Sequence, residues 1–462
     1  MLDSMKYRKS LASCGHYTRF LILIISTIAL TFVMANSLAL NFTVICMVEE
    51  PIGYEKEFMK EINITEPVPI YSLSEQTWLF SAIAIGNIIG TIPLTWSNNV
   101  LGVKLTFFIY GLASGISTLL IPFFVAVGFW PVFFMRVLQG FGLSISMTSL
   151  GAIVSAWSSI QGSGVYISIL SLHLQLGAIL VMPISGALCQ SSFGWPAVYY
   201  ILGASTVLSF IIFFGFYKNH PDDHFLVGEK ELNIIKEGKM AQTGEHPPIP
   251  YKAIMTDISV IGVIVCCFGG CFALQIMFQY GPTYLNKVLR FDVEKTGFAG
   301  ALPFVMSVIV KLIAGPMSDM LTCVSQKARI IIFNTVSQFP IGVCFILMAC
   351  VPPEMGLLVI ISYSLVNSFD GLNAVGVAKC VQLMSLTNSV VILILPFIVS
   401  ILAPDNTDSQ WAVVWYCLAA IVFVTMIFFN LVCEAEPRHW AKIEKKSYQN
   451  SEKGLNLRKE NA

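Results

Sequence analysis

The sequence has few charged residues. Asp, Glu, Lys and Arg together make up 12% of its 462 residues, about half of their share in an ordinary soluble domain. Hydrophobic residues make up 56%. This composition excludes an ordinary soluble fold and indicates that most of the chain lies inside a membrane.

An excess of charge of either sign is also absent. The 27 Lys and Arg residues balance the 27 Asp and Glu residues, so no net field attracts nucleic acid. The sequence contains no nucleotide-binding P-loop, no serine-hydrolase elbow and no His-Glu-x-x-His motif. We therefore predict a protein that is not an enzyme, binds no nucleic acid and needs no cofactor.

The twelve cysteines show no zinc-site spacing. Most of them lie in apolar runs, and we interpret them as small buried hydrophobic residues. These include Cys46, Cys266, Cys267, Cys271, Cys344, Cys350 and Cys417.

Twelve apolar runs are long enough to cross a bilayer, six on each side of a polar central stretch. The first, Phe20 to Val48, is too long for a secretory signal. Because lipid offers the backbone no hydrogen bonds, each run is predicted to be a helix. The predicted fold is all-α, with twelve transmembrane helices in two six-helix bundles. The expected parts are a cytoplasmic tail at 1–19, bundles at 20–217 and 258–433, a cytoplasmic loop at 218–257 and a cytoplasmic tail at 434–462.

The distribution of basic residues predicts the orientation. With both termini inside, 20 of the 27 Lys and Arg residues fall in inner segments and five in outer loops. This is a strong positive-inside bias. The acidic loop 49–75 then lies outside, where its sequon at Asn63 is a candidate glycosylation site. In the central loop, Glu229 to Lys236 is compatible with an amphipathic helix or with a solvated linker.

A charge inside a membrane is costly, so each one is a functional hypothesis. Arg136 heads a small and polar stripe that continues through Gly140, Ser144 and Thr148 at four-residue spacing. Its guanidinium suits a carboxylate or a phosphate, so we expect it to bind an anion in a hydrated cavity. The alternative is a side chain that reaches the outer headgroups.

Three more ionisable residues fall within predicted spans. His173 can contact substrate or carry a proton, or it can be a neutral residue bonded to a neighbouring helix. Gln175 faces another direction, so only one of these two is expected to contact substrate. Lys311 and Asp370 form a structural charge pair, take part in substrate or ion coupling, or are exposed to the cytoplasmic cavity.

Several longer stretches resemble the anion/cation symporter branch of the major facilitator superfamily, which includes sialin, vesicular glutamate transporters and type I sodium/phosphate cotransporters. They span about residues 20 to 440. The carrying segments are Arg136-Val-Leu-Gln-Gly140, Gln175 to Gly186 with Phe193-Gly-Trp-Pro196, Gly281-Pro-Thr-Tyr-Leu285, Ala301-Leu-Pro303, Gly315-Pro-Met-Ser-Asp319 and Glu436 to Trp440. The resemblance implies an alternating-access carrier for organic anions or phosphate, driven by sodium or protons, in a plasma, vesicle or lysosomal membrane.

The same resemblance suggests roles for individual residues. Arg136 matches the helix 4 arginine implicated in anion binding, and Tyr284 lies in a shared segment and is a candidate substrate contact. Lys104, Asp319 and Arg329 fall at the expected cytoplasmic gate. The chain departs from the glutamate-transporting members at four positions, where it has Ser37, Phe80, Leu143 and Gly270.

The leading hypothesis is a monomeric secondary transporter for a small organic anion or phosphate. Its predicted substrate contacts are Arg136, Ser144, His173, Gln175 and Tyr284. Leu143 replaces the acid that usually accepts a proton beside the arginine, which leaves an uncoupled uniporter as the main alternative. A receptor-like or scaffold protein without flux is the third.

Overall fold

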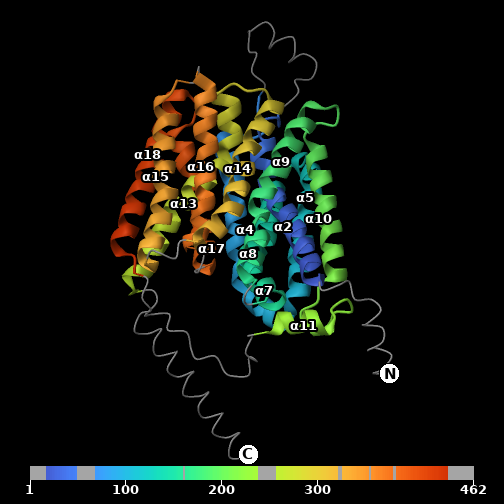
Figure 1. Ribbon diagram of the computed structural model, residues 1–462. Helices are drawn as coiled ribbons and strands as arrows, with labels where there is room; N and C mark the ends of the chain where they lie inside the picture. The colour runs from blue at the N-terminus through green and yellow to red at the C-terminus, as the bar shows by residue number, and fades with distance from the viewer. Residues whose placement is uncertain are drawn as a thin grey trace, which may run out of the picture.

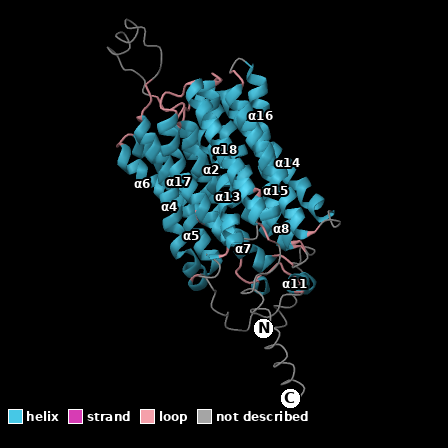
Figure 2. Ribbon diagram, turned by 90° about the vertical axis from the view of Figure 1, so that its left-hand side faces the viewer, coloured by secondary structure: helices cyan, strands magenta, loops and turns pink. Residues whose placement is uncertain are grey.

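The long apolar runs form helices that pack side by side in two groups (Figure 1). The structure is a computed structural model that describes residues 17–48, 68–159, 162–237, 256–320, 325–352, 355–377 and 381–434. Side chains are described over the same ranges except at 314–320, 326, 372–377 and 381–384. Within these ranges regular structure is helical (Figure 2), apart from an isolated bridge between Val48 and Pro69.

The first group of helices comes from the N-terminal half of the chain. It contains α2 (Thr18–Thr43), α4 (Leu73–Val100), α5 (Gly102–Val125), α6 (Phe129–Leu143), α7 (Ile145–Trp157), α8 (Ser163–Ser171), α9 (His173–Gln190) and α10 (Pro196–Phe216). Two predicted spans are broken in the middle, at Ser144 and at Leu172. Neither break falls on a proline. At the first, the Ser144 hydroxyl donates back to the Phe141 carbonyl oxygen, a local bond that competes with the helix.

The second group comes from the C-terminal half. It contains α13 (Ile258–Thr283), continued by the π-helical turn η2 (Tyr284–Val288), then α14 (Val293–Met320), α15 (Gln326–Cys350), α16 (Gly356–Val377), α17 (Val381–Leu402) and α18 (Asp408–Val432). Eleven described helical segments are long and apolar enough to span a membrane, and Gly356–Gly371 is a shorter apolar segment in α16. These twelve segments agree with the twelve predicted helices.

Aromatic contacts join the two groups on the side that the charge distribution predicts to be outer. Trp78 of α4 packs edge-on against Phe397 of α17, with ring centroids 5.1 Å apart. Phe80 packs in the same way on Tyr280 of α13, at 5.4 Å. These contacts join α4 of the N-terminal half to α13 and α17 of the C-terminal half.

At the opposite end, a short segment folds under the N-terminal half. It includes the 3-10 turn η1 (Pro221–Asp223) and the helix α11 (Glu229–Lys236), seen at the bottom of Figure 1. The buried Glu231 carboxylate accepts a 2.8 Å hydrogen bond from the Arg19 backbone N–H in the first turn of α2. A carboxylate at a helix N-terminus is favourable. Glu229 to Lys236 is therefore a helix that packs on the bundle, not a solvated linker.

One cysteine prediction is wrong. Cys46, just after α2, forms a disulfide with Cys189 in the last turn of α9. The bond joins the outer ends of the first and fifth spans, the side on which an oxidising compartment is expected. The sequence does not reveal this pair because both cysteines lie at the ends of apolar runs and are 143 residues apart.

Candidate functional site

Close backbone contact between α4 and α6 determines where Arg136 lies. A Cβ atom added at Gly86 would overlap the Val137 carbonyl oxygen, and one added at Gly140 would overlap the Ile83 carbonyl oxygen. Only glycine permits this approach. It brings the α6 turn that carries Arg136 directly against α4.

The Arg136 side chain is fully buried and donates four hydrogen bonds. Its Nε donates to the Leu79 carbonyl oxygen at 3.2 Å, and its Nη1 to the Ser37 carbonyl oxygen at 3.0 Å. Nη1 also donates to Gln139 Oε1 at 3.0 Å, and Nη2 to Asn41 Oδ1 at 3.3 Å. All four acceptors are uncharged. They hold the guanidinium in place without neutralising it.

No carboxylate forms an ion pair with Arg136 in the part of the chain that the structure describes. The two ion pairs found there are Lys236–Asp222 and Lys295–Asp292, both on the surface. A buried cation is normally paired because its desolvation is costly. Arg136 therefore has the position and the charge to receive an anion from outside the protein.

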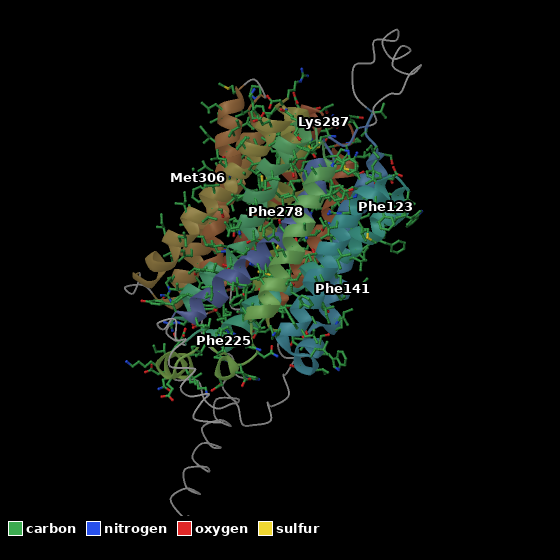
Figure 3. The ribbon with its side chains drawn as sticks, turned by 90° about the vertical axis from the view of Figure 1, so that its right-hand side faces the viewer. Phe123, Phe141, Phe225, Phe278, Lys287 and Met306 are labelled. Carbon is green, nitrogen blue, oxygen red and sulfur yellow. A yellow bond between two sulfur atoms is a disulfide. The ribbon has the colours of Figure 1, made fainter. Side chains whose placement is uncertain are left out.

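The guanidinium lines a central cavity between the two halves. The volume of this cavity is about 60 Å³, which is room for several waters. Figure 3 shows Phe278, one of its wall residues, midway between Lys287 at one end and Phe225 at the other. The wall is formed by Met34, Ser37, Leu38, Asn41, Phe80, Ile83, Asn87, Arg136, Leu143, Ser146, Met147, Leu174, Leu274, Gln275, Phe278, Gln279, Ser385, Asn388 and Ile392.

His173 lies behind this wall and joins two broken spans. Its Nδ1 lies 2.6 Å from the Leu170 carbonyl oxygen, and its Nε2 lies 2.5 Å from the Ser146 hydroxyl. A carbonyl oxygen can only accept, so Nδ1 donates to it, and in a neutral ring Nε2 accepts from the Ser146 hydroxyl. These bonds match the alternative in which His173 is bonded to a neighbouring helix. Ser146, which sequence reasoning missed, is the residue of this pair that faces the cavity.

The other predicted contacts also lie outside the wall. Ser144 turns back into its own helix, and Gln175 is buried in α9. Tyr284 packs between Trp411 and Trp415, with ring centroids 5.2 Å and 5.0 Å away. Of the five predicted substrate contacts, Arg136 is the one that the cavity exposes.

Lys311 and Asp370 are near neighbours in the C-terminal half without an ion pair within 4.0 Å. The Lys311 ammonium is buried and donates to the Ser171 carbonyl oxygen at 3.4 Å, so it contacts the opposite half. Asp370 is close enough to interact with it electrostatically. The roles in ion coupling or charge pairing stay predictions.

The gate residues are placed only in part. The Lys104 backbone N–H donates to Asn219 Oδ1 at 2.9 Å, and its ammonium lies over the Phe214 ring at 4.4 Å. Arg329 lies in the first turns of α15. The side chain of Asp319 and the sequon at Asn63 lie outside the described residues.

Comparison with known proteins identifies the family. The model of the Major Facilitator Superfamily matches residues 18–385. The chain belongs to the Major Facilitator Superfamily.

Relatives within the superfamily match most of the chain. Human sialin is 25% identical over 380 residues, covering 79% of this chain and 77% of sialin. Human sodium-dependent phosphate transport protein 1 is 25% identical over 431 residues, covering 89% and 92%. These relatives confirm the resemblance to the anion/cation symporter branch, and hence a multi-pass membrane transporter rather than an enzyme.

Solved structures of the superfamily share the fold. The xylose transporter XylE from E. coli, in a partially occluded inward open conformation, gives a TM-score of 0.62 at 14% identity and covers 90% of this chain and 97% of that one. A bacterial homologue of human Spinster, inward-facing and unoccupied, gives 0.63 at 12% identity, with the same coverage. The prediction of two six-helix bundles is confirmed at the level of the fold.

Proposed function

We propose that this major facilitator carries a small anion across the membrane by alternating access, with Arg136 as the anion-binding residue. The observation that supports it most is a fully buried guanidinium with four uncharged acceptors on the wall of a central cavity. The names of the relatives point the same way, since one set is named for phosphate transport. Phosphate or a small organic anion is the proposed substrate class.

The proposed transport unit is a single chain, embedded in the bilayer and acting without a nucleic-acid partner or an organic cofactor. Residues from both halves of one chain complete the wall, with Asn41 on α2 and Asn388 on α17, so rocking of the halves would expose the cavity to each side in turn. A sodium or proton gradient is the proposed driving force.

Uniport is the second candidate, and the wall itself favours it. No carboxylate is found among the described residues that form the wall, and Leu143 lies there in place of the proton-accepting acid. A coupling proton bound beside Arg136 would need such a group. Under uniport, an imposed sodium or proton gradient would not drive accumulation.

Uptake by purified protein in liposomes tests the proposal. A panel of labelled anions that includes phosphate is offered with and without sodium and proton gradients. Arg136→Gln is expected to lower uptake of every accepted anion by at least about tenfold, because charge-assisted hydrogen bonds contribute roughly 1.5–3 kcal/mol. Lys287→Gln, at an exposed outer position, is the control. Unchanged uptake in Arg136→Gln would overturn the assignment.

A further inference from the structure

The C-terminal half contributes carboxamides to the cavity wall. Gln275 and Gln279 lie one turn apart on α13, and Asn388 of α17 accepts a 2.8 Å hydrogen bond from Gln275 Nε2. Gln279 is only 3% exposed, and neither its Nε2 nor its Oε1 has a partner in the described part of the chain. A buried amide without partners is costly. Its position on the wall points to a ligand that supplies them.

The charge on this wall is limited to one group. Among its nineteen residues Arg136 is the charged side chain, beside five carboxamides, three hydroxyls and ten apolar side chains. One guanidinium can neutralise one negative charge. A second anionic group would be buried without a counter-charge, which is strongly unfavourable.

A ring contact joins the two halves at residues that are next in sequence to Leu79 and Gln279. Phe80 follows Leu79, whose carbonyl oxygen accepts from Arg136, and Tyr280 follows Gln279. The Phe80 and Tyr280 rings pack edge-on at 5.4 Å. Arg136 and Gln279 line the same cavity, one from each half of the chain.

Resting on the proposed function, we infer that Gln275, Gln279 and Asn388 form a carboxamide subsite that selects monoanions with a neutral hydrogen-bonding group at the end remote from the charge. A carboxamide both donates and accepts, so it suits a hydroxyl, carbonyl or amide group. A ligand that bonds to these carboxamides and to Arg136 would therefore contact both halves of the chain. Apolar wall residues such as Leu143 and Phe278 contact the middle of the ligand.

Equilibrium binding of three six-carbon probes tests this subsite. Gluconate is a hydroxylated monoanion, hexanoate an apolar monoanion and adipate a dianion. Apparent affinities come from the concentration dependence of the melting temperature of the purified full chain. The wild type is expected to bind gluconate at least about tenfold more tightly than hexanoate, and to bind adipate more weakly than gluconate.

Gln279→Leu is expected to lower the preference for gluconate over hexanoate by about tenfold, through the loss of roughly one buried hydrogen-bonding partner. The ratio within one variant does not depend on how much protein folds, and Gln279→Asn, with a shorter carboxamide, serves if the leucine variant does not fold. Gln338→Leu is the matched control, since Gln338 of α15 is also buried and unpartnered but lies outside the wall.

The outcomes separate this inference from the proposed function. An unchanged ratio in Gln279→Leu, equal affinities for gluconate and hexanoate in the wild type, or a preference for adipate overturns the subsite while Arg136 can still bind anions. Gluconate binding that survives Arg136→Gln overturns the proposed function itself. A wild type that binds none of the probes but binds phosphate overturns the monoanion class alone.

Discussion

Arg136 and Gln139 lie one turn apart on α6, and their side chains are joined by a 3.0 Å hydrogen bond from Nη1 to Oε1. Gln139 is fully buried, and its Nε2 donates a second hydrogen bond to the Thr118 hydroxyl at 2.7 Å. An uncharged residue thus occupies a position at which a carboxylate would neutralise the guanidinium. The arrangement orients the positive charge and leaves it available.

Gln139→Glu is therefore expected to weaken anion binding. A carboxylate at this position would pair with Arg136 inside the protein and compete with the substrate. The KM for uptake of an accepted anion should rise by at least about tenfold, as expected for roughly 1.5 kcal/mol of competition. Gln139→Met, which adds no charge, is the control and should change the KM much less. Equal KM values in the two variants would refute the idea.

Leu143→Glu is expected to make uptake sensitive to pH. Leu143 lies on the cavity wall two turns from Arg136, so an ionised glutamate there would compete with the anion. Protonation at lower pH would relieve this competition, so uptake should rise as the pH falls through the range in which the glutamate takes up a proton. Leu143→Gln, which cannot ionise, should keep the wild-type pH profile. A glutamate variant that follows the glutamine variant at every pH would contradict the prediction.

The disulfide between Cys46 and Cys189 should stabilise the N-terminal half. It ties the outer ends of α2 and α9, and such bonds typically contribute about 2–4 kcal/mol. Cys46→Ser and Cys189→Ser should each lower the melting temperature, and the double variant no further, because either change removes the same bond. Cys417→Ser, at an exposed free thiol, is the control. Additive losses would show that the two cysteines act separately.

His224 should make the folded state less stable in acid. The buried ring packs edge-on against Trp157 at 5.4 Å, and burial lowers the pKa of His224 below its ordinary value of 6.5. The unfolded chain therefore takes up this proton first as the pH falls. The stability contribution is fully present above about pH 6.5 and is lost as the pH falls toward the lower, folded-state pKa.

Melting temperatures at pH 7.5 and 5.5 test this. The wild type should lose stability at the lower pH, and His224→Gln should lose less. His220→Gln, at a nearby exposed position, should retain the wild-type difference. The prediction fails if the His224 and His220 variants respond to pH alike.

The sequence predicted those parts of the molecule that bulk physical constraints determine. Because lipid offers the backbone no hydrogen bonds, long apolar runs form helices, and the sequence therefore predicts the twelve helical segments. Arg136 could be found because a charge within a span is costly and conspicuous. The prediction for Tyr284 depends on a shared segment alone, and in the folded chain this residue packs against Trp411 and Trp415.

The other polar residues of the cavity wall could not be predicted from the sequence, because a neutral carboxamide within a span does not by itself indicate a binding site. Asn41, Asn87 and Asn388 can be recognised only through their hydrogen-bond partners on other helices. The four-residue spacing of Gln275 and Gln279 was the one available signal, since it predicts a shared helix face. The disulfide and the break at Ser144 also depend on contacts that spacing does not reveal.

A structure of the protein with its best accepted anion bound tests the central claim most directly. The account predicts an anionic group within hydrogen-bond distance of the Arg136 guanidinium, with the far end of the ligand toward Gln279. An anion that binds in the central cavity away from Arg136, while the guanidinium keeps only its four bonds to Leu79, Ser37, Gln139 and Asn41, would contradict it.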